Sequence, residues 1–164
     1  MFFYRIKQFY MAVTAKITFN DEKFLENYLN KQELNLFNKL SINEKAHSIR
    51  VAKDIINVCI ENKLDKKYFT KLALLHDIGK IQGNLNILEK SLLVILNKIS
   101  KGKIKKFSNI HKINIYYNHG EIGAKILRKQ GYDERFLYLV KNHHNNDIIE
   151  DMDLNILKQC DDRN

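Results

Sequence analysis

Hydrophobic side chains recur at intervals of three and four residues along almost the whole chain, which is the spacing of one face of an α-helix. No segment of strand length alternates hydrophobic and polar residues, and the sequence contains no internal repeat. We therefore expect an all-α protein. Its helices are expected over residues 2–17, as one or two short helices within 21–40, and over 42–62, 66–77, 85–99, 119–130, 133–144 and 151–162.

Residues at the ends of these segments predict where the helices begin and end. Asn20 and Ser41 can accept backbone hydrogen bonds as N-caps of the helices that follow them. Gly79 is expected to end the helix over 66–77, and Gly102, with the lysines around it, interrupts the helical pattern. These residues set the expected helix boundaries.

The first helical segment, over residues 2–17, is amphipathic, with aromatic and aliphatic side chains on one side and basic ones on the other. A helix docked on the rest of the protein is the favoured interpretation. A helix lying at a membrane interface is the alternative. We expect residues 1–40 to form a helical extension that packs on a domain formed by residues 41–164.

The length of 164 residues suffices for one domain with a substantial core. No apolar run approaches the roughly 20 residues of a membrane-spanning helix, and the first residues lack the apolar stretch and cleavage site of a secretory signal. Cys59 and Cys160 lie among apolar helical positions without a wider cysteine framework, which indicates reducing conditions. We therefore expect a cytoplasmic protein with no membrane span.

The formal net charge is +9, so the surface is expected to attract polyanions or phosphorylated small molecules. The densest basic stretch runs from Lys98 to Lys106. We interpret it as a solvated loop and helix edge. An electrostatic funnel or a nucleic-acid contact is the alternative, but no RNA-binding motif of aromatic residues and glycine accompanies these lysines. A small phosphorylated partner is therefore favoured over nucleic acid.

Five of the six histidines and two aspartates occur in the order His, His-Asp, His, His-His, Asp. Imidazole nitrogens and carboxylate oxygens are the ligands that hold catalytic metal ions. We therefore predict a metal enzyme. The candidate metal ligands are His47, His76, Asp77, His119, His143, His144 and Asp161.

Each of these residues lies on, or at the end of, a line of hydrophobic residues that should face the interior. His47, for example, shares a helical line with Val51 and Ile55. Placing imidazoles and carboxylates inside a protein costs several kcal/mol unless they are paired. A single inward histidine is explained equally well by a hydrogen bond to a carbonyl. One shared metal centre, however, accounts for side chains from five predicted helices at once.

The segments around these residues resemble the HD superfamily of metal-dependent phosphohydrolases, in the branch whose motif is HDIG. The resemblance extends over residues 47–164. The matching segments are HSIRVA (47–52), LALLHDIGK (72–80), HGEIGAKIL (119–127), VKNHH (140–144) and CDDRN (160–164). The resemblance implies a compact all-α bundle around one or two metal ions. We also expect Gly120 and Gly123 to allow helices to approach closely around the metals.

The resemblance further implies that one group of ligands holds a first ion and that a second group shares a bridging carboxylate with it. The first group is His47, His76, Asp77 and Asp161, and the second is Asp77, His119 and His143. The match to CDDRN favours Asp161 over Asp162. For His144, the alternatives are binding a further ion, orienting a ligand and contacting substrate. The mixed nitrogen and oxygen ligands suit iron or manganese, with magnesium, nickel or zinc as alternatives.

The activity implied by the resemblance is hydrolysis of a phosphoester or phosphoanhydride of a small phosphorylated molecule by a metal-activated hydroxide, with a nucleotide as the favoured substrate. Asp77 and Lys80 are the expected catalytic residues, Lys80 stabilising charge on a phosphate oxygen. An ordinary lysine near a helix C-terminus is the alternative interpretation of Lys80. A di-iron oxygenase of the same superfamily and a non-catalytic nucleotide-sensing module are the alternative functions.

The chain departs from two branches of the family. It contains no proline, whereas the branch that hydrolyses cyclic dinucleotides carries a Gly-Tyr-Pro segment soon after its paired histidines. It also has no RNA-binding KH domain, which the RNA-degrading members carry. The remaining polar residues have ordinary interpretations: Glu121 and Lys125 as a surface ion pair, His111 as an exposed residue, and Arg50 as either a solvated or a cleft residue.

Overall fold

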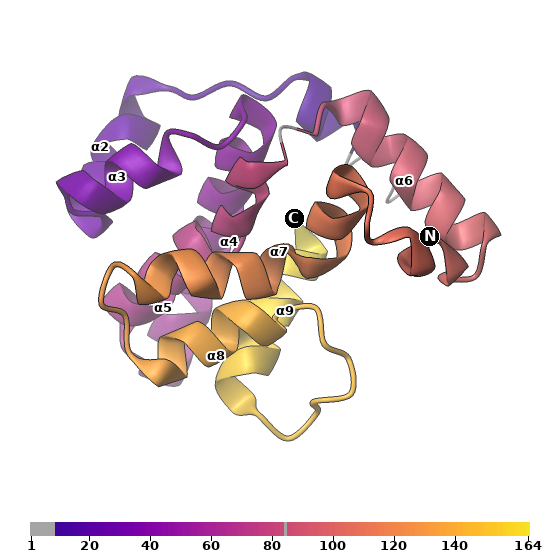
Figure 1. The fold of residues 1–164 in the computed structure, drawn as a ribbon. Helices are drawn as coiled ribbons and strands as arrows, with labels where there is room; N and C mark the ends of the chain where they lie inside the picture. The colour runs from indigo at the N-terminus through magenta and orange to yellow at the C-terminus, as the bar shows by residue number, and fades with distance from the viewer. Residues whose placement is uncertain (1–8, 84) are drawn as a thin grey trace.

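The computed structural model describes residues 9–83 and 85–164, and this part of the chain is helical, with no β-strand (Figure 1). The all-α prediction is therefore confirmed. A short helical stretch covers residues 9–13. The α-helices that follow are α2 (Phe19–Tyr28), α3 (Lys31–Phe37), α4 (Ile42–Asn62), α5 (Lys66–Leu75), α6 (Ile87–Ile99), α7 (His111–Arg128), α8 (Glu134–Asn142) and α9 (Met152–Arg163). The 3-10 helices are η1 (Ile78–Gln82) and η2 (Lys103–Phe107).

Polar side chains just before the helices explain where several of them begin. At α2, Thr18 and Asp21 form a reciprocal capping box, in which each side chain accepts a hydrogen bond from the other residue's backbone N–H. Ser41 is the N-cap residue of α4, as expected. The expectation that Asn20 caps a helix is wrong, because Thr18 already satisfies the first turn and leaves Asn20 inside α2.

The helix expected over residues 2–17 is shorter than predicted. Its first part, residues 1–8, lies outside the described residues. In the described part the helix covers 9–13, and residues 15–18 are not helical. The stretch from residue 14 to α2 contains three β-branched residues, and Thr18 must be extended to cap α2, so the chain cannot continue as one helix.

The chain also leaves α5 earlier than expected, at Leu75, and Gly79 lies inside η1 rather than at a helix end. η1 packs on α7 with almost no space between the two backbones. A Cβ atom built on Gly79 would lie 1.9 Å from the carbonyl oxygen of His119. Gly120 likewise packs against the backbone of the last turn of α8, and Gly123 against η1, which confirms the expected close packing around these two glycines.

Helix α7 begins at His111, eight positions before the expected start near His119. Its first two turns are rich in Ile, Asn and Tyr, which have modest helix propensity. Ile113 and Ile115 are nevertheless buried in these turns. Burial of these side chains therefore outweighs propensity, and the helix extends toward α6.

The main hydrophobic core lies between α4, α5, α7, α8 and α9. Its fully buried side chains include Ile55, Leu74, Phe136 and Leu154. A second, smaller cluster lies between α6 and α7. Figure 1 shows α6 on the opposite side of the molecule from α2 and α3. Within the described residues, no helix combines the length and apolar character needed to span a membrane.

A buried carboxylate attaches α3 to the rest of the protein. Glu33 accepts a hydrogen bond from Lys71 of α5 at 2.8 Å and another from the hydroxyl of Tyr132, which follows α7. Its second oxygen accepts from the backbone N–H of Asn30 at 2.8 Å and so caps α3. Burial alone would raise the pKa of Glu33, but Lys71 and Tyr132 lower it by more.

We expect Glu33→Gln to reduce the free energy of unfolding by about 2 kcal/mol at neutral pH, because the charge-assisted bonds to Lys71 and Tyr132 weaken. Glutamine can still cap α3, so the loss reports on these contacts between helices. A lowered carboxyl pKa stabilises the fold above its ordinary value of 4.5 and loses that effect as the pH falls through the folded-state value. The difference between the two proteins, measured by denaturant unfolding, should therefore shrink in acid. Glu26→Gln, at an exposed position of α2, is the control and should change little.

We expect Gly79→Ala to reduce the free energy of unfolding by at least about 2 kcal/mol, because the new Cβ meets backbone atoms of α7 that cannot move aside. Gly131→Ala is the matched control. Gly131 has a φ of 82° but no atom within 4 Å of a built Cβ, so the substitution should cost only about 1 kcal/mol. Equal losses for the two variants, measured by denaturant unfolding, would show that the contact between η1 and α7 is not tight in solution.

Candidate metal centre

The structure brings the seven candidate ligand residues together from distant parts of the chain. His47 lies in α4, His119 in α7 and Asp161 near the end of α9. The pairs His76-Asp77 and His143-His144 directly follow α5 and α8. Ligand-type atoms up to 114 positions apart in the sequence therefore lie in one cluster.

The carboxylate of Asp77 lies at the middle of the cluster. Its Oδ1 is 3.2 Å from Nε2 of His119 and 3.6 Å from Nε2 of His143. Its Oδ2 is 3.5 Å from Nε2 of His76 and 3.9 Å from Nε2 of His47. The two oxygens of one carboxylate therefore face two different pairs of imidazoles.

The second carboxylate, that of Asp161, completes one of two ligand groups. Its Oδ1 lies 2.8 Å from Nε2 of His47 and 3.6 Å from Nε2 of His76. Within each group, one ligand atom from every residue lies within 4.8 Å of the others. The groups are His47, His76 and Asp161, and Asp77, His119, His143 and His144. Asp162 is exposed and belongs to neither group.

Helix ends position the two histidines that follow α5 and α8. His76 and His143 are the C-cap residues of these helices. Each donates from Nδ1 to the carbonyl three residues earlier, that of Ala73 at 2.7 Å and that of Val140 at 2.6 Å. The last carbonyls of a helix have no backbone partner within it, so these side-chain bonds also complete the helix ends. Because a carbonyl only accepts, Nδ1 carries the proton and Nε2 of the neutral ring is left to bind a metal.

Four atoms at the centre of the cluster are buried without a hydrogen-bond partner in the described structure. They are Nε2 of His76, Nε2 of His119, Nε2 of His143 and Oδ1 of Asp77. Buried polar atoms without a partner are costly and rare in folded proteins. Here all four converge, and they are nitrogen and oxygen donors of the kind that bind divalent metals. The residues present therefore fit a metal ion.

The two carboxylates of the cluster and His119 have the charges that a cation requires. Burial alone would raise the pKa of Asp77, but the adjacent Lys80 and His76 hold it well below its usual value. Burial alone would also raise the pKa of Asp161, but its hydrogen bond with His47 and the nearby imidazole of His76 lower it by more. Burial and the charge of Lys80 lower the pKa of His119 to about 4. At neutral pH the site therefore offers two carboxylates and the neutral imidazole of His119, the forms that coordinate metals.

Two lysines lie beside the carboxylates. Lys80 of η1 forms a largely buried ion pair with Oδ2 of Asp77. The charge of Lys80 acts on Lys90 of α6 and, with burial, lowers the pKa of Lys90 to about 8. Glu44, in the first turn of α4, attracts both lysines. Lys90 was not predicted from the sequence, because the hydrophobic spacing of α6 does not indicate that the face carrying Lys90 and Leu93 is the buried one.

His144 lies at the exposed edge of the cluster. Its side chain is 56% exposed, so the expectation that it faces the interior is wrong. It comes after the end of α8, where helical periodicity no longer sets the direction of a side chain. A cleft of about 440 Å³ opens beside it and is lined by His119, His143, His144 and polar residues of segments 117–118 and 141–147. Three residues of the ligand cluster therefore line this cleft.

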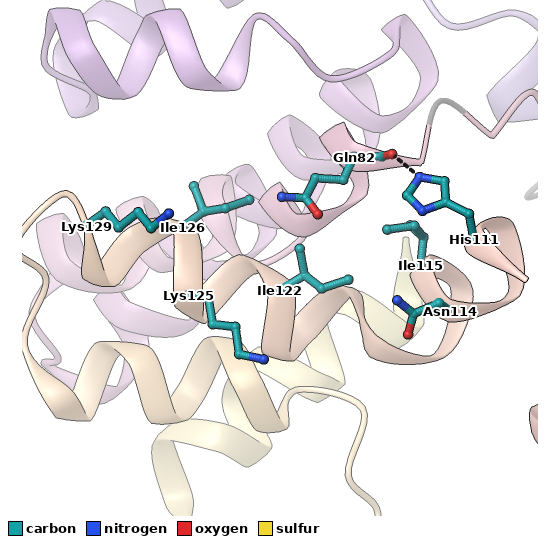
Figure 2. Close-up of a pocket in the computed structure, with 8 residues that line it drawn as sticks. All are labelled: Gln82, His111, Asn114, Ile115, Ile122, Lys125, Ile126 and Lys129. Atoms are coloured by element: carbon teal, nitrogen blue, oxygen red, sulfur yellow. Dashed lines mark hydrogen bonds between the residues drawn. The ribbon is translucent and has the colours of Figure 1, made fainter. Parts of the chain in front are cut away.

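His111 lies outside the cluster, as the sequence analysis expected. Its Nε2 donates to the carbonyl of Gln82 at 2.7 Å, and both residues line a pocket of about 360 Å³ between η1 and α7 (Figure 2). The other residues that line this pocket are Asn114, Ile115, Ile122, Lys125, Ile126 and Lys129. None of these lining residues has a carboxylate, so the pocket lacks the mixed ligand set of the metal cluster.

The other polar residues considered in the sequence analysis lie around the site. Glu121 and Lys125 form the expected exposed ion pair on α7, at 2.8 Å. Arg50, one turn after His47, is partly buried, and its Nε has no hydrogen-bond partner among the described residues. Arg50 is therefore not a fully solvated helix arginine.

Comparison with known proteins agrees with this geometry. No curated protein and no solved structure gives a significant match to the chain. The family model of the HD domain matches residues 45–162, which contain all seven residues of the cluster. Proteins with this domain are generally metal-dependent phosphohydrolases that act on small phosphorylated substrates. Because the match covers well over half of its length, the chain belongs to the HD-domain family.

Proposed function

We propose that this protein is a metal-dependent phosphohydrolase that cleaves a phosphoester or phosphoanhydride bond of a nucleotide. One observation carries the proposal: Nε2 of three buried histidines and one oxygen of Asp77 converge without hydrogen-bond partners among the described residues. Such an arrangement is costly unless a cation binds it, and the family of the chain uses cations for phosphate chemistry. The seven-residue cluster and the family membership therefore support the same activity.

In the proposed site Asp77 would be a ligand of two ions. Its Oδ2 and its Oδ1 face different pairs of imidazoles, which suits a bridging carboxylate. The ligands proposed for the first ion are His47, His76, Asp77 and Asp161, and those for the second are Asp77, His119 and His143. His144, at the exposed edge, is proposed to contact the substrate or an ion bound there. The mixed nitrogen and oxygen ligands favour iron or manganese over magnesium, nickel or zinc.

Divalent ions bound here would polarise a phosphoryl oxygen and lower the pKa of coordinated water. The protein's own contribution is to position and neutralise the phosphate. Lys80 contacts Asp77, so its ammonium lies next to the central carboxylate of the ligand cluster, where it can bind a non-bridging phosphoryl oxygen and stabilise the charge that develops on it. Lys90 adds a second positive charge next to Lys80, and an anion between them would relieve their repulsion.

The cleft beside His144 supports a small substrate. Its volume of about 440 Å³ is within the ordinary range for small-molecule sites. Lys105 and Lys141 line it together with the phenol of Tyr117, the amides of several asparagines and the carboxylates of Glu121 and Asp147. Lysines can bind further phosphates, and amides and an aromatic ring can bind a base by hydrogen bonds and stacking. These features favour a nucleotide over a simple phosphate ester.

The activity is tested by elemental analysis of protein purified without chelators, followed by a screen of nucleotides for phosphate release. We expect bound iron or manganese and hydrolysis of at least one nucleotide. Oxygen consumption without phosphate release would instead assign the site to an oxygenase. If protein that contains its metal shows neither reaction, an enzymatic role is contradicted.

We expect Asp77→Ala to lose the metal and to reduce phosphate release by at least about 100-fold. The reason is that one carboxylate serves both ligand groups. Substitution of a residue that only hydrogen-bonds to a metal ligand can already reduce activity by about 100-fold. Metal content and the rate on a chromogenic phosphoester are measured on the same sample, with circular dichroism to check the fold. Asp162→Ala, at the exposed neighbouring carboxylate, is the control and should keep metal and activity. Full activity in the Asp77 variant would refute the ligand assignment.

Lys80→Ala should keep its metal but turn over roughly 100-fold more slowly, because it removes a charge that acts on the phosphoryl group and not a ligand. Metal content and kcat distinguish this result from loss of the site. Lys125→Ala, which removes an exposed lysine of α7, is the matched control and should leave kcat unchanged. An unchanged kcat in the Lys80 variant would show that Lys80 only pairs with Asp77.

A further inference from the structure

Helix α6 exposes a row of large hydrophobic side chains. Between 39% and 74% of each of five leucine and isoleucine residues is accessible to solvent. These residues are Leu88, Leu92, Ile95, Leu96 and Ile99. Phe107 of η2 and Ile110, which follows it, are also more than half exposed. Contiguous apolar surface of this kind is uncommon on soluble proteins and marks an interaction site.

The exposed row follows from the orientation of α6. At 100° per residue, its five hydrophobic residues fall within an arc of about 100° on the helix surface. The opposite face, which carries Lys90, Leu93 and Asn97, lies against the domain, where Leu93 is buried and Asn97 accepts a hydrogen bond from Tyr117. An ordinary surface helix turns its apolar face inward. In α6 most of the apolar residues face solvent instead.

Positive charge is concentrated around the same row. Residues 87–120 contain seven lysines and a single acidic residue, Glu89, which forms an ion pair with Lys112. Five of these lysines lie between the end of α6 and the end of η2, and all five are exposed. They are Lys98, Lys101, Lys103, Lys105 and Lys106. Exposed aliphatic side chains therefore adjoin a dense cationic segment.

We propose that α6 and η2 form a docking surface for an anionic phospholipid bilayer. A helix that presents leucine and isoleucine along one face, with lysines next to it, binds at the interface of a bilayer by burying the apolar face and attracting acidic headgroups. The surface belongs to α6 and η2, so this inference does not rest on the proposed catalytic activity. Docking here would hold the protein at the membrane without a spanning helix.

The positive charge of the surface indicates which partner would bind this apolar helix face. A second copy of the chain would add another lysine-rich segment of the same sign to the interface, and the two positive segments would repel each other. A nucleic acid would satisfy the lysines, but aliphatic side chains do not stack on bases as aromatic rings do. An anionic bilayer matches both features at once, because it offers acidic headgroups above a hydrocarbon layer.

Flotation with lipid vesicles tests the proposal on the full chain. Vesicles of phosphatidylcholine alone are compared with vesicles that also contain roughly 30 mol% phosphatidylglycerol, at low and at high salt. We expect binding to the anionic vesicles only, weakened by salt. Two double variants probe the surface: Leu92→Ser with Ile95→Ser, and Lys103→Ala with Lys106→Ala. We expect the lysine variant to bind about 30-fold more weakly, from about 1 kcal/mol per lysine, and the apolar variant at least about tenfold more weakly.

Matched controls carry the same changes at exposed positions of other elements. They are Ile60→Ser with Ile149→Ser, and Lys66→Ala with Lys67→Ala, and both should bind like the unmodified protein. Equal binding to neutral and anionic vesicles would overturn the proposal. Full binding by both the apolar variant of α6 and the lysine variant of η2 would also overturn it, as would equal losses of binding in the control variants. A dimer in lipid-free sedimentation that Leu92→Ser with Ile95→Ser abolishes would assign the face to a second copy. Circular dichroism checks folding, and the lysine variant keeps the test decisive if the apolar one misfolds.

Discussion

A buried carboxylate, that of Asp77, is the constraint on which the arrangement of the helices depends. An ionised carboxylate inside a protein is strongly unfavourable unless positive or hydrogen-donating groups surround it. Those groups come from α4, α5, η1, α7 and α8, whose histidines and Lys80 lie around its two oxygens. The helices must therefore pack so that these side chains meet. The hydrophobic core brings the helices together, and the charged cluster restricts how they are placed.

The approach of η1 to α7 shows that the placement of two elements can be restricted by direct contact between their backbones. Gly79 lies two residues after Asp77, and its backbone touches that of His119 and Gly123. The contact brings two elements that carry site residues together without any side chain between them. The hydrogen-bonded anchors at Nδ1 of His76 and His119 then set the direction of each ring. Backbone packing and hydrogen bonds to carbonyls thus position the site residues together.

Much of the fold and of the candidate site could be predicted from the sequence. Long hydrophobic periodicity located α4, α6 and α9 closely, and the order of histidines and aspartates selected the side chains that cluster. The 3-10 turn at η1 could not be predicted, because it depends on contact between Gly79 and a helix some 40 positions later. The exposure of His144 and the place of Lys90 beside Lys80 were missed for a related reason. Both depend on how an element is oriented by the rest of the fold, which periodicity within that element does not contain.

The two histidines that end α5 and α8 have a consequence for how the chain can vary over evolution. Each completes its helix with its own ring, through the carbonyl three residues earlier. Inserting or deleting one residue in either helix would turn the ring by about 100° and shift it by about 1.5 Å along the axis. Relatives of this chain should therefore keep the spacing between the start of each of these helices and the histidine that ends it.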